Sequence, residues 1–203
     1  MQTVVGPVAQ RSRPVGRARS TTADTLGRIG LELFIQRGFD NVTVEDIAEA
    51  AGIGRRTFFR YFPSKNDLPW GDFDALLCSM HARLAAVPAD IPVFDALREA
   101  VIDFNRFPAE EIPFLRQRME CLLKTPTLVA HSALRYRAWR QVVADFAAER
   151  LGVSGSSHLA MTLGQVCLGI SLSAYEEWLE DERLDLAELI DQGFCDMRRV
   201  FAG

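Results

Sequence analysis

The sequence is poor in the side chains that build metal centres. It has only three histidines and four cysteines, and no Cys-x-x-Cys or His-x-x-x-His pair brings two of them to metal-ligand spacing. The cysteines are Cys78, Cys121, Cys167 and Cys195, each in an apolar helical context. Such a context predicts buried free thiols. We therefore expect no metal site and no cofactor.

Long apolar runs and a secretion signal are missing as well. Charged residues interrupt every apolar stretch well before the length that a membrane-spanning helix needs. Residues 1–16 contain Arg11 and Arg13 but no apolar segment followed by a small-residue cleavage site. These absences predict a cytoplasmic protein without a membrane partner.

Charge is present but unevenly distributed. Residues 1–65 hold ten Lys or Arg and six Asp or Glu, a net charge of +4, whereas the remainder carries −8. A basic head on an acidic body predicts a polyanionic partner at one end only. Residues 1–20 are rich in Gly, Pro, Ser and Arg and contain no acidic residue, which indicates a disordered basic arm.

Helical periodicity covers the rest of the chain, and no window shows sustained strand alternation. A first helix is expected from a threonine cap at Thr21 or Thr22 to Gly38. Longer helices are expected near 64–87, with Ser64 as N-cap, and near 91–107, 110–124, 127–151, 156–181 and 185–201. Prolines and glycines separate them. The sequence predicts an all-α protein.

Residues 43–62 carry the pattern of a DNA-binding helix-turn-helix. Thr43 is a good N-cap, and Asp46 stands three residues later, close to a capping box. The small side chains of Ala48 and Ala51 allow two short helices to approach closely. The Gly52–Gly54 segment supplies the tight turn between them.

The second short helix carries the candidate DNA contacts. Arg55, Arg56 and Thr57 open this helix and are expected to read base edges, while Phe58 and Phe62 face inward. Four further residues, Thr43, Arg60, Tyr61 and Lys65, are expected to hold phosphates. Solvated arginines on a helical hairpin that only packs are the alternative interpretation.

Over residues 21–68 the chain resembles the TetR family of transcriptional regulators. The family pattern is matched at Ile47, Ala48, Ala51, Gly52, Ile53, Thr57, Phe62, Pro63, Ser64, Lys65 and Leu68. Two departures stand out. Phe59, which we include among the DNA-binding residues, occupies a position where the family often has a tyrosine, and Arg55 and Arg56 replace residues that are often small.

The resemblance implies a helix-turn-helix domain over residues 21–66 and a larger ligand-binding and dimerisation domain over residues 67–203. The expected partners are double-stranded operator DNA, an apolar small-molecule effector and a second copy of the chain. In the family the last two helices form the dimer interface. The apolar residues available for this interface are Leu159, Leu163, Val166, Ile170, Leu189, Phe194, Met197 and Val200, with an intrachain core as the alternative.

The effector pocket is expected among the C-terminal helices. Candidate lining residues are Phe73, Met80, Phe104, Phe114, Arg118, Trp139 and Cys167, with plain core packing as the alternative for each. Residues 63–74 also resemble the TetR-family regulators associated with mycofactocin biosynthesis clusters, which implies a long-chain acyl-CoA. Candidates for the cation that faces its phosphates are Arg106, Arg116, Arg118, Arg135 and Arg137. The residues alone indicate only an apolar ligand.

The leading hypothesis is therefore a ligand-responsive repressor that controls mycofactocin-related genes. An enzyme with a helical body is a weaker alternative, because the sequence has no nucleophile elbow, phosphate-binding loop or paired carboxylates. A helical acyl-binding protein with a non-functional helix-turn-helix is a further alternative. Salt-dependent DNA binding separates the first hypothesis from the other two.

Overall fold

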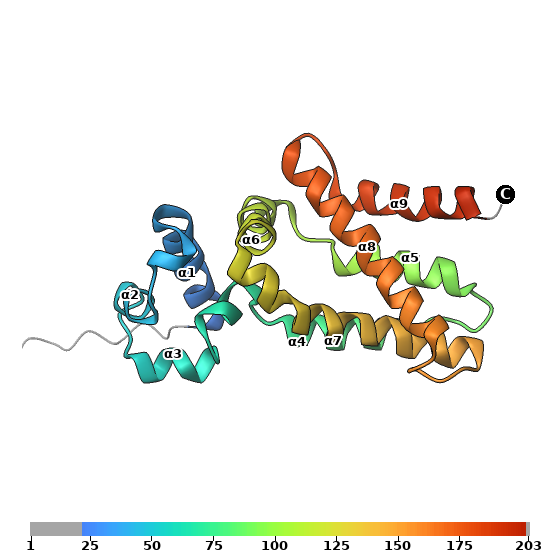
Figure 1. Ribbon diagram of the computed structural model, residues 1–203, viewed down its shortest axis with the longest axis horizontal. Coiled ribbons are helices and arrows are strands. Elements are labelled where there is room, and N and C mark those ends of the chain that lie inside the picture. Colours follow the sequence, from blue (N-terminus) through green and yellow to red (C-terminus); the bar gives the residue numbers. More distant parts are fainter. Residues whose placement is uncertain (1–21, 202–203) are drawn as a thin grey trace, which may run out of the picture.

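The computed structural model describes residues 22–201, and all regular elements in that range are helices, as predicted. The predicted arm of residues 1–20 lies outside the described residues. The elements are α1 (Ala23–Arg37), η1 (Phe39–Asn41), α2 (Val44–Ala50), α3 (Arg55–Tyr61), η2 (Lys65–Trp70), α4 (Phe73–Ala85), α5 (Val93–Phe104), η3 (Ala109–Glu111), α6 (Ile112–Lys124), α7 (Pro126–Leu151), α8 (His158–Glu180) and α9 (Leu186–Phe201). Helices α1 to α3 form a small head, and α4 to α9 form an elongated body beside it (Figure 1).

Local sequence accounts for the ends of the short helices in the head. Thr22 caps α1 by accepting a hydrogen bond from the Thr25 amide. Thr43 and Asp46 form a complete capping box at the start of α2, which confirms the sequence pattern.

The turn between α2 and α3 is a Schellman motif. Gly52 has φ of +66°, a conformation that favours glycine. The Ile53 amide donates to the Ala48 carbonyl, and the Gly52 amide donates to the Glu49 carbonyl. These bonds end α2 and fix the angle at which α3 leaves it.

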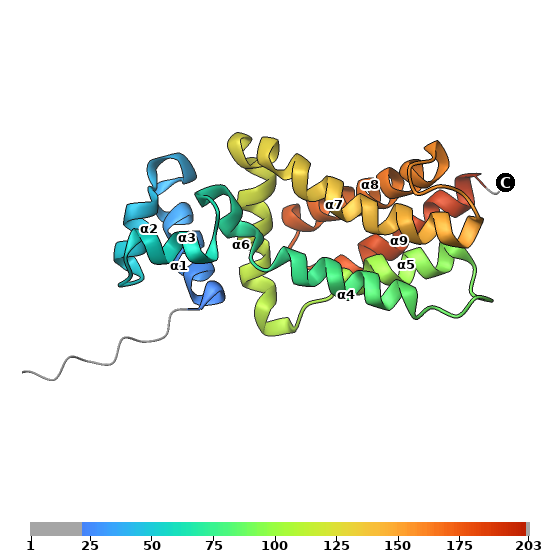
Figure 2. The same cartoon turned by 90° about the horizontal axis from the view of Figure 1, so that it is seen from below.

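The helix predicted near 64–87 is interrupted, so that prediction was wrong at its N-terminal end. Residues Lys65–Trp70 form the short 3₁₀-helix η2, and Gly71, with φ of +57°, ends it. Pro69 lacks the amide that an α-helix needs at this point. Asp72, rather than Ser64, caps the following α-helix by accepting from the Ala75 amide at 3.2 Å. The η2–α4 joint is therefore a bend that contains Gly71. The chain changes direction just before α4 in Figure 2.

Two of the prolines expected to break helices instead begin them. Pro113 lies in the first turn of α6, and Pro126 is the first residue of α7. A proline fits there because first-turn amides have no intrahelical acceptor.

The body is built around the packing of α7 against α8, with α9 packed on α8 and α5. Gly164 on α8 allows a close approach, since a Cβ atom there would lie 2.8 Å from the Arg140 carbonyl oxygen of α7. A continuous apolar core runs from Leu26 in the head through Leu68 and Trp70 of η2 to Trp178 in the body. Head and body are therefore joined by packed side chains as well as by the chain itself.

The expectation of buried thiols holds for one cysteine only. Cys167 is buried, and this burial raises the pKa of its thiol to about 12. Cys121 and Cys195 are half-buried, and Cys78 is exposed on α4. For Cys78 the apolar sequence context was misleading, because its side chain falls on the solvent side of an amphipathic helix.

Candidate DNA-binding and effector sites

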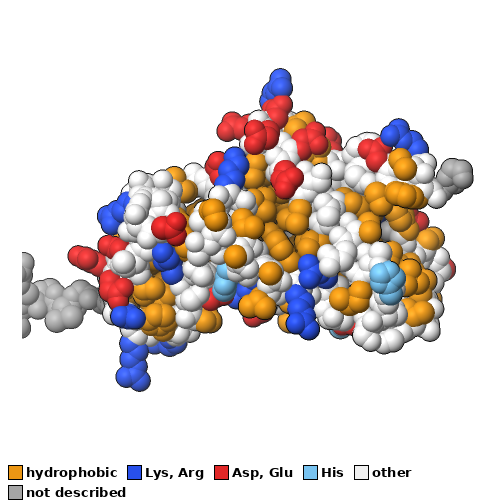
Figure 3. Space-filling view, in the orientation of Figure 1, with side chains coloured by type: hydrophobic (Ala, Val, Ile, Leu, Met, Phe, Trp, Pro, Cys, Tyr) orange, Lys and Arg blue, Asp and Glu red, His pale blue; other side chains and the backbone are white. Residues whose placement is uncertain are grey.

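Helix α3 displays the predicted DNA-reading side chains on its outer face. Arg55, Arg56, Phe59 and Arg60 are exposed, whereas Phe58 is fully buried and anchors the helix to the head. Lys and Arg side chains project from this end of the molecule in Figure 3. The arrangement presents cations at the N-terminal turn of a short helix, where helix-turn-helix proteins contact base edges.

The side chains of Arg55 and Arg56 differ in their surroundings. Arg55 lies 2.6 Å from a Glu45 carboxylate oxygen, and its guanidinium lies 5.4 Å from the centre of the Phe59 ring. This ion pair is mostly exposed, so exchanging the carboxylate for a DNA group costs little. Arg56 makes no ion pair within residues 22–201 and is directly available.

Two of the predicted phosphate contacts also have structural roles. The Lys65 ammonium donates to the Phe39 and Val42 carbonyls, each at 2.8 Å, and lies 4.1 Å from the Phe39 ring centre. Thr43 uses its hydroxyl in the α2 cap. A phosphate contact from either residue stays a prediction, and it must coexist with these bonds.

At the end of α3, the Arg60 guanidinium donates to the Tyr61 hydroxyl at 3.3 Å and lies 5.1 Å from the ring centre. The pair follows Thr57, which is half-buried. All eight predicted DNA-binding residues therefore lie on α3 or at the starts of α2 and η2, the two segments that neighbour it in the chain.

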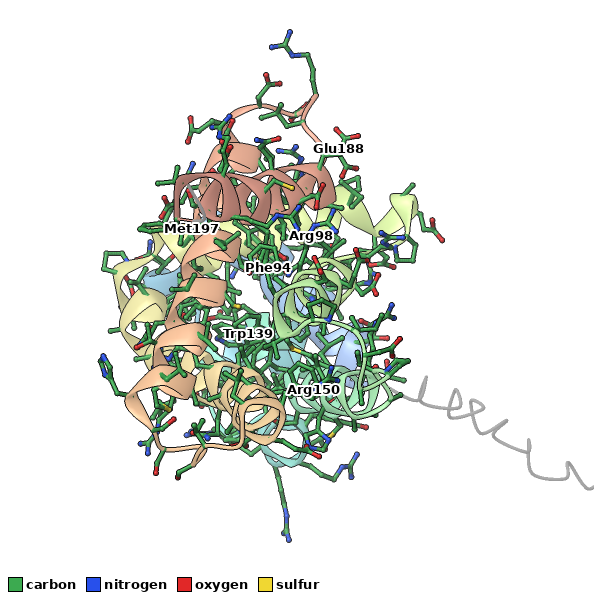
Figure 4. The ribbon with its side chains drawn as sticks, turned by 90° about the vertical axis from the view of Figure 1, so that its right-hand side faces the viewer. Phe94, Arg98, Trp139, Arg150, Glu188 and Met197 are labelled. Atoms are coloured by element: carbon green, nitrogen blue, oxygen red, sulfur yellow. The ribbon has the colours of Figure 1, made fainter. Side chains whose placement is uncertain are left out.

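The predicted effector residues do not share one cavity. Phe73, Phe104 and Trp139 line a hollow of about 70 Å³ inside the body, which we call the inner hollow. Figure 4 shows Trp139 in the middle of the body, viewed from its far end. Met80 is buried in the core and lines none of the described hollows.

The inner hollow is aromatic with a few polar groups. Tyr175 donates to the Asn105 side-chain oxygen at 2.9 Å, and burial raises the pKa of Tyr175 well above its ordinary value. The Trp70 indole nitrogen is buried without a hydrogen-bond partner among residues 22–201. An unpaired buried donor is costly, so this group stands out as a place for an additional acceptor.

Phe114 and Arg118 lie in a second cavity of about 370 Å³ between α1, the η2–α4 joint and α6. We call it the junction pocket. In the wall of this pocket, Arg28 of α1 donates to both carboxylate oxygens of Glu111 at 2.6 Å and stacks over the Phe114 ring at 4.3 Å. This contact joins the head to the body. Its two partners are far apart in the sequence, so sequence patterns could not predict it.

Cys167 lies in a third space, an apolar groove of about 790 Å³ between α5, α8 and α9. Phe94 of α5 points toward α9, where it meets Phe194 at 5.7 Å between ring centres (Figure 4). A neighbouring groove of about 750 Å³ follows the outer side of α8 and α9.

A polar cluster that sequence analysis missed holds the η2–α4 joint to α7. Buried Asp67 accepts hydrogen bonds from Ser64 at 2.7 Å and from His131 and Arg135 at 3.0 Å each. Arg135 also contacts Asp74 of α4 at 3.2 Å. Burial alone would raise the pKa of Asp67, but these hydrogen bonds outweigh it and hold the pKa below its ordinary value.

No helix within residues 22–201 is long and apolar enough to span a membrane. Among the same residues, no group of three or more His, Cys, Asp or Glu side chains could hold a metal ion.

Comparisons with known proteins agree with this architecture. Residues 29–68 match the family model described as bacterial regulatory proteins of the tetR family, and residues 91–202 match the MftR C-terminal domain. The chain is 44% identical over 180 residues to a protein of Mycobacterium tuberculosis (strain H37Rv) named as a mycofactocin biosynthesis transcriptional regulator, MftR, covering 89% of this chain and 91% of the relative.

Two solved structures have the same fold at low sequence identity. FadR of Thermus thermophilus, a TetR-family repressor in complex with lauroyl-CoA, is 21% identical with a TM-score of 0.54, covering 85% of this chain and 91% of that one. The fatty acid degradation regulator FadR of Bacillus halodurans is 14% identical with a TM-score of 0.59, covering 88% and 95%. The chain is a DNA-binding regulator of the TetR family, not an enzyme, and its C-terminal domain is of the MftR type.

Proposed function

We propose that the protein is a repressor of mycofactocin-related genes that binds its operator as a homodimer and responds to a long-chain acyl-CoA. One observation carries this proposal: a bent joint at Gly71 links the head, where α3 displays its exposed arginines, to a body that contains apolar hollows. The similarity to the mycobacterial regulator supports the choice of target genes.

The acyl-CoA class rests on two supports. The inner hollow and the junction pocket combine aromatic walls with a cation, as an amphiphile with an anionic head requires. One structural neighbour is a TetR-family repressor in complex with lauroyl-CoA, and another is a fatty acid degradation regulator. Their identity to this chain is low, so they support the class of ligand and not its contacts.

Dimerisation is proposed through the outer faces of α8 and α9. Leu159 is 51% exposed, Val200 66% and Phe201 77%, which is unusual for large apolar side chains on one face. Gly169 has open space where a side chain would project, so a partner helix can approach closely. Phe194, one of the eight predicted interface residues, packs against Phe94 of its own chain and belongs to the intrachain core.

The proposed switch acts through α4. Phe73 and Met80 place two apolar side chains of this helix in the interior, and α4 begins directly after the Gly71 bend. A ligand that displaces Phe73 would change the direction of α4 and with it the separation of the two heads in a dimer. Half-sites one helical turn apart lie about 34–36 Å from each other, so a shift of a few Å prevents simultaneous docking.

A gel-shift experiment tests the proposal directly. DNA from upstream of the protein's own gene is titrated with the full chain at several salt concentrations, with and without oleoyl-CoA. We expect salt-dependent binding to this DNA over a scrambled fragment of equal length, and a change in affinity when oleoyl-CoA is added. Equal affinity for both fragments would contradict the repressor function, and an affinity that oleoyl-CoA leaves unchanged would contradict the proposed effector.

A further inference from the structure

Five arginines of the body were candidates for binding an anion, and the structure distinguishes them by their contacts. Arg116 donates to the Trp178 and Asp181 carbonyls, and Arg135 pairs with two aspartates. Arg106 is exposed and lies 3.7 Å from an Asp103 carboxylate oxygen, and Arg137 is exposed on α7. These four are either engaged or directed to solvent.

Arg118 differs from the other four. It lines the junction pocket, is only partly exposed, and makes no ion pair or hydrogen bond with any residue in the range 22–201. Its guanidinium lies 4.8 Å from the Phe114 ring centre, a contact that orients the cation without neutralising it. Burial lowers the pKa of Arg118 below its ordinary value, although the carboxylates of Asp24 and Glu111 act in the opposite direction.

The nearby carboxylates are directed elsewhere. Glu111 is held by Arg28 through both oxygens, and Asp24 lies 3.6 Å from the same guanidinium. Asp24 is largely exposed at the rim of the pocket. Asp72, a third carboxylate in the wall of the pocket, accepts from the Ala75 amide. Of the two arginines that line the pocket, Arg118 is therefore the one without a hydrogen bond or ion pair among the described residues.

Trp70 connects the pocket with the interior of the body. Its side chain lines both the junction pocket and the inner hollow, and its buried indole N–H lacks an acceptor among the described residues. A Cβ atom on Gly71 would lie 3.9 Å from a terminal nitrogen of Arg118, so the cation lies directly over the η2–α4 bend.

We propose that the junction pocket binds the carboxylate or phosphate of an amphiphilic effector through Arg118, and that the apolar chain of this effector passes Trp70 into the inner hollow. This inference rests on the proposed function only in taking the effector to be a long apolar chain with an anionic group. It assigns the anionic end of that molecule to a site between the head and the body.

The volumes of the two spaces indicate how binding of a long apolar chain would affect the bend at Gly71. The junction pocket has about 370 Å³, but the inner hollow has only about 70 Å³ and is too small for a long chain. Entry of the chain must therefore displace side chains that line the hollow, and two of these, Trp70 and Phe73, lie on either side of Gly71. A ligand anchored at Arg118 would act on the joint that connects α3 to the body.

Calorimetric titration of the full chain with four probes tests the assignment. Laurate and lauroyl-CoA carry an anion, 1-dodecanol has the same chain length without one, and coenzyme A lacks the chain. We expect at least one of the two anionic amphiphiles to bind the wild type roughly 10-fold or more tightly than dodecanol. Which of them binds more tightly distinguishes a carboxylate from a phosphate as the bound group.

Two variants of the cation and one control complete the experiment. Arg118→Gln is expected to lose roughly 10-fold or more in affinity for the anionic amphiphile and none for dodecanol, and Arg118→Lys to retain most of it. Arg137→Gln, on the exposed side of α7, is expected to bind all probes like the wild type. Circular dichroism melting shows whether each variant is folded.

Several outcomes would overturn the assignment. Equal wild-type affinity for dodecanol and for both anionic amphiphiles would do so without any variant. A folded Arg118→Gln protein that binds the anionic amphiphile like the wild type would show that the anion lies elsewhere, while the proposed effector class would survive. Absence of binding by every amphiphile would overturn the assignment and the proposed effector together.

Discussion

The head and the body of this protein use their residues in different ways. In the head, α1 and α2 begin at threonine caps, α2 ends at a glycine with positive φ, and Phe58 seals the interior completely. The body also has side-chain caps, at Asp72 for α4 and at Ser157 for α8, but hollows remain between its helices. A region that must present fixed side chains to DNA is closely packed, whereas a region that must admit a ligand retains space.

The region between them belongs to both. Segment η2 contributes Leu68 and Trp70 to the continuous core and Asp67 to the polar cluster on α7. Its bend at Gly71 lies beside Arg118. The comparison therefore predicts that changes in the head affect folding and DNA affinity, changes in the body affect ligand response, and changes in η2 affect both.

The largest effect is expected from Phe58→Ala. Removal of this fully buried ring should destabilise the head by about 3–5 kcal/mol and abolish DNA binding. The matched variant Phe59→Ala removes the adjacent ring, which is 42% exposed, and should leave the melting temperature nearly unchanged while altering DNA affinity. Thermal melts and gel shifts measure the two properties. Similar melting temperatures of the two variants would contradict the inference that the buried Phe58 ring stabilises the head.

Asp67→Asn tests the connection at η2. Loss of the charge that Ser64, His131 and Arg135 stabilise should cost about 2 kcal/mol at neutral pH. The lowered pKa of Asp67 means that this stabilisation is complete above the ordinary pKa of 3.8 and is lost as the pH falls through the lower folded-state value. The difference between wild type and variant should therefore shrink below about pH 4.

The control for this measurement is Asp74→Asn. Asp74 contacts the same Arg135 but its side chain is 81% exposed, so its replacement should cost less than about 1 kcal/mol. Equal losses in the two variants, measured by denaturant unfolding at several pH values, would show that burial of Asp67 has no special role.

The same comparison explains what sequence could predict. Caps and turns involve residues three to five positions apart, so the capping box at Thr43 and the Gly52 turn were predictable. The Arg28–Glu111 pair and the Asp67–His131 contact join residues 83 and 64 positions apart, and no periodicity connects such partners. Of the proposed lining residues, Phe73, Met80, Trp139 and Cys167 are buried, but sequence could not show that Phe73 and Phe114 face different cavities.

Within the DNA interface, Arg56→Ala and Lys65→Ala are expected to behave differently. Arg56→Ala should lose about 1–3 kcal/mol of binding free energy on the operator and relax sequence preference. Lys65→Ala should weaken binding to all sequences about equally, and it should also lower the melting temperature because the ammonium bonds Phe39 and Val42. Wild-type operator affinity in both variants would contradict the assignment of α3 as the recognition helix.

The smallest expected effect concerns the basic arm, which lies outside the described residues. Arg11, Arg13, Arg17 and Arg19 should release counterions from DNA, so deletion of residues 1–19 should flatten the dependence of affinity on salt. An unchanged slope in gel shifts at several salt concentrations would show that the arm takes no part in binding.

The central claim is that DNA binding in the head and ligand binding in the body are coupled through η2 and α4. Thermodynamic reciprocity makes this coupling measurable. If the effector lowers the affinity of the protein for its operator, the operator must lower the affinity of the protein for the effector by the same factor. Titrating oleoyl-CoA calorimetrically into the full chain, with and without operator DNA, gives both affinities. We expect the operator to change the affinity for oleoyl-CoA by roughly 5-fold or more. Identical affinity in both titrations would contradict the coupling and leave a DNA-binding protein whose apolar interior does not act as a sensor.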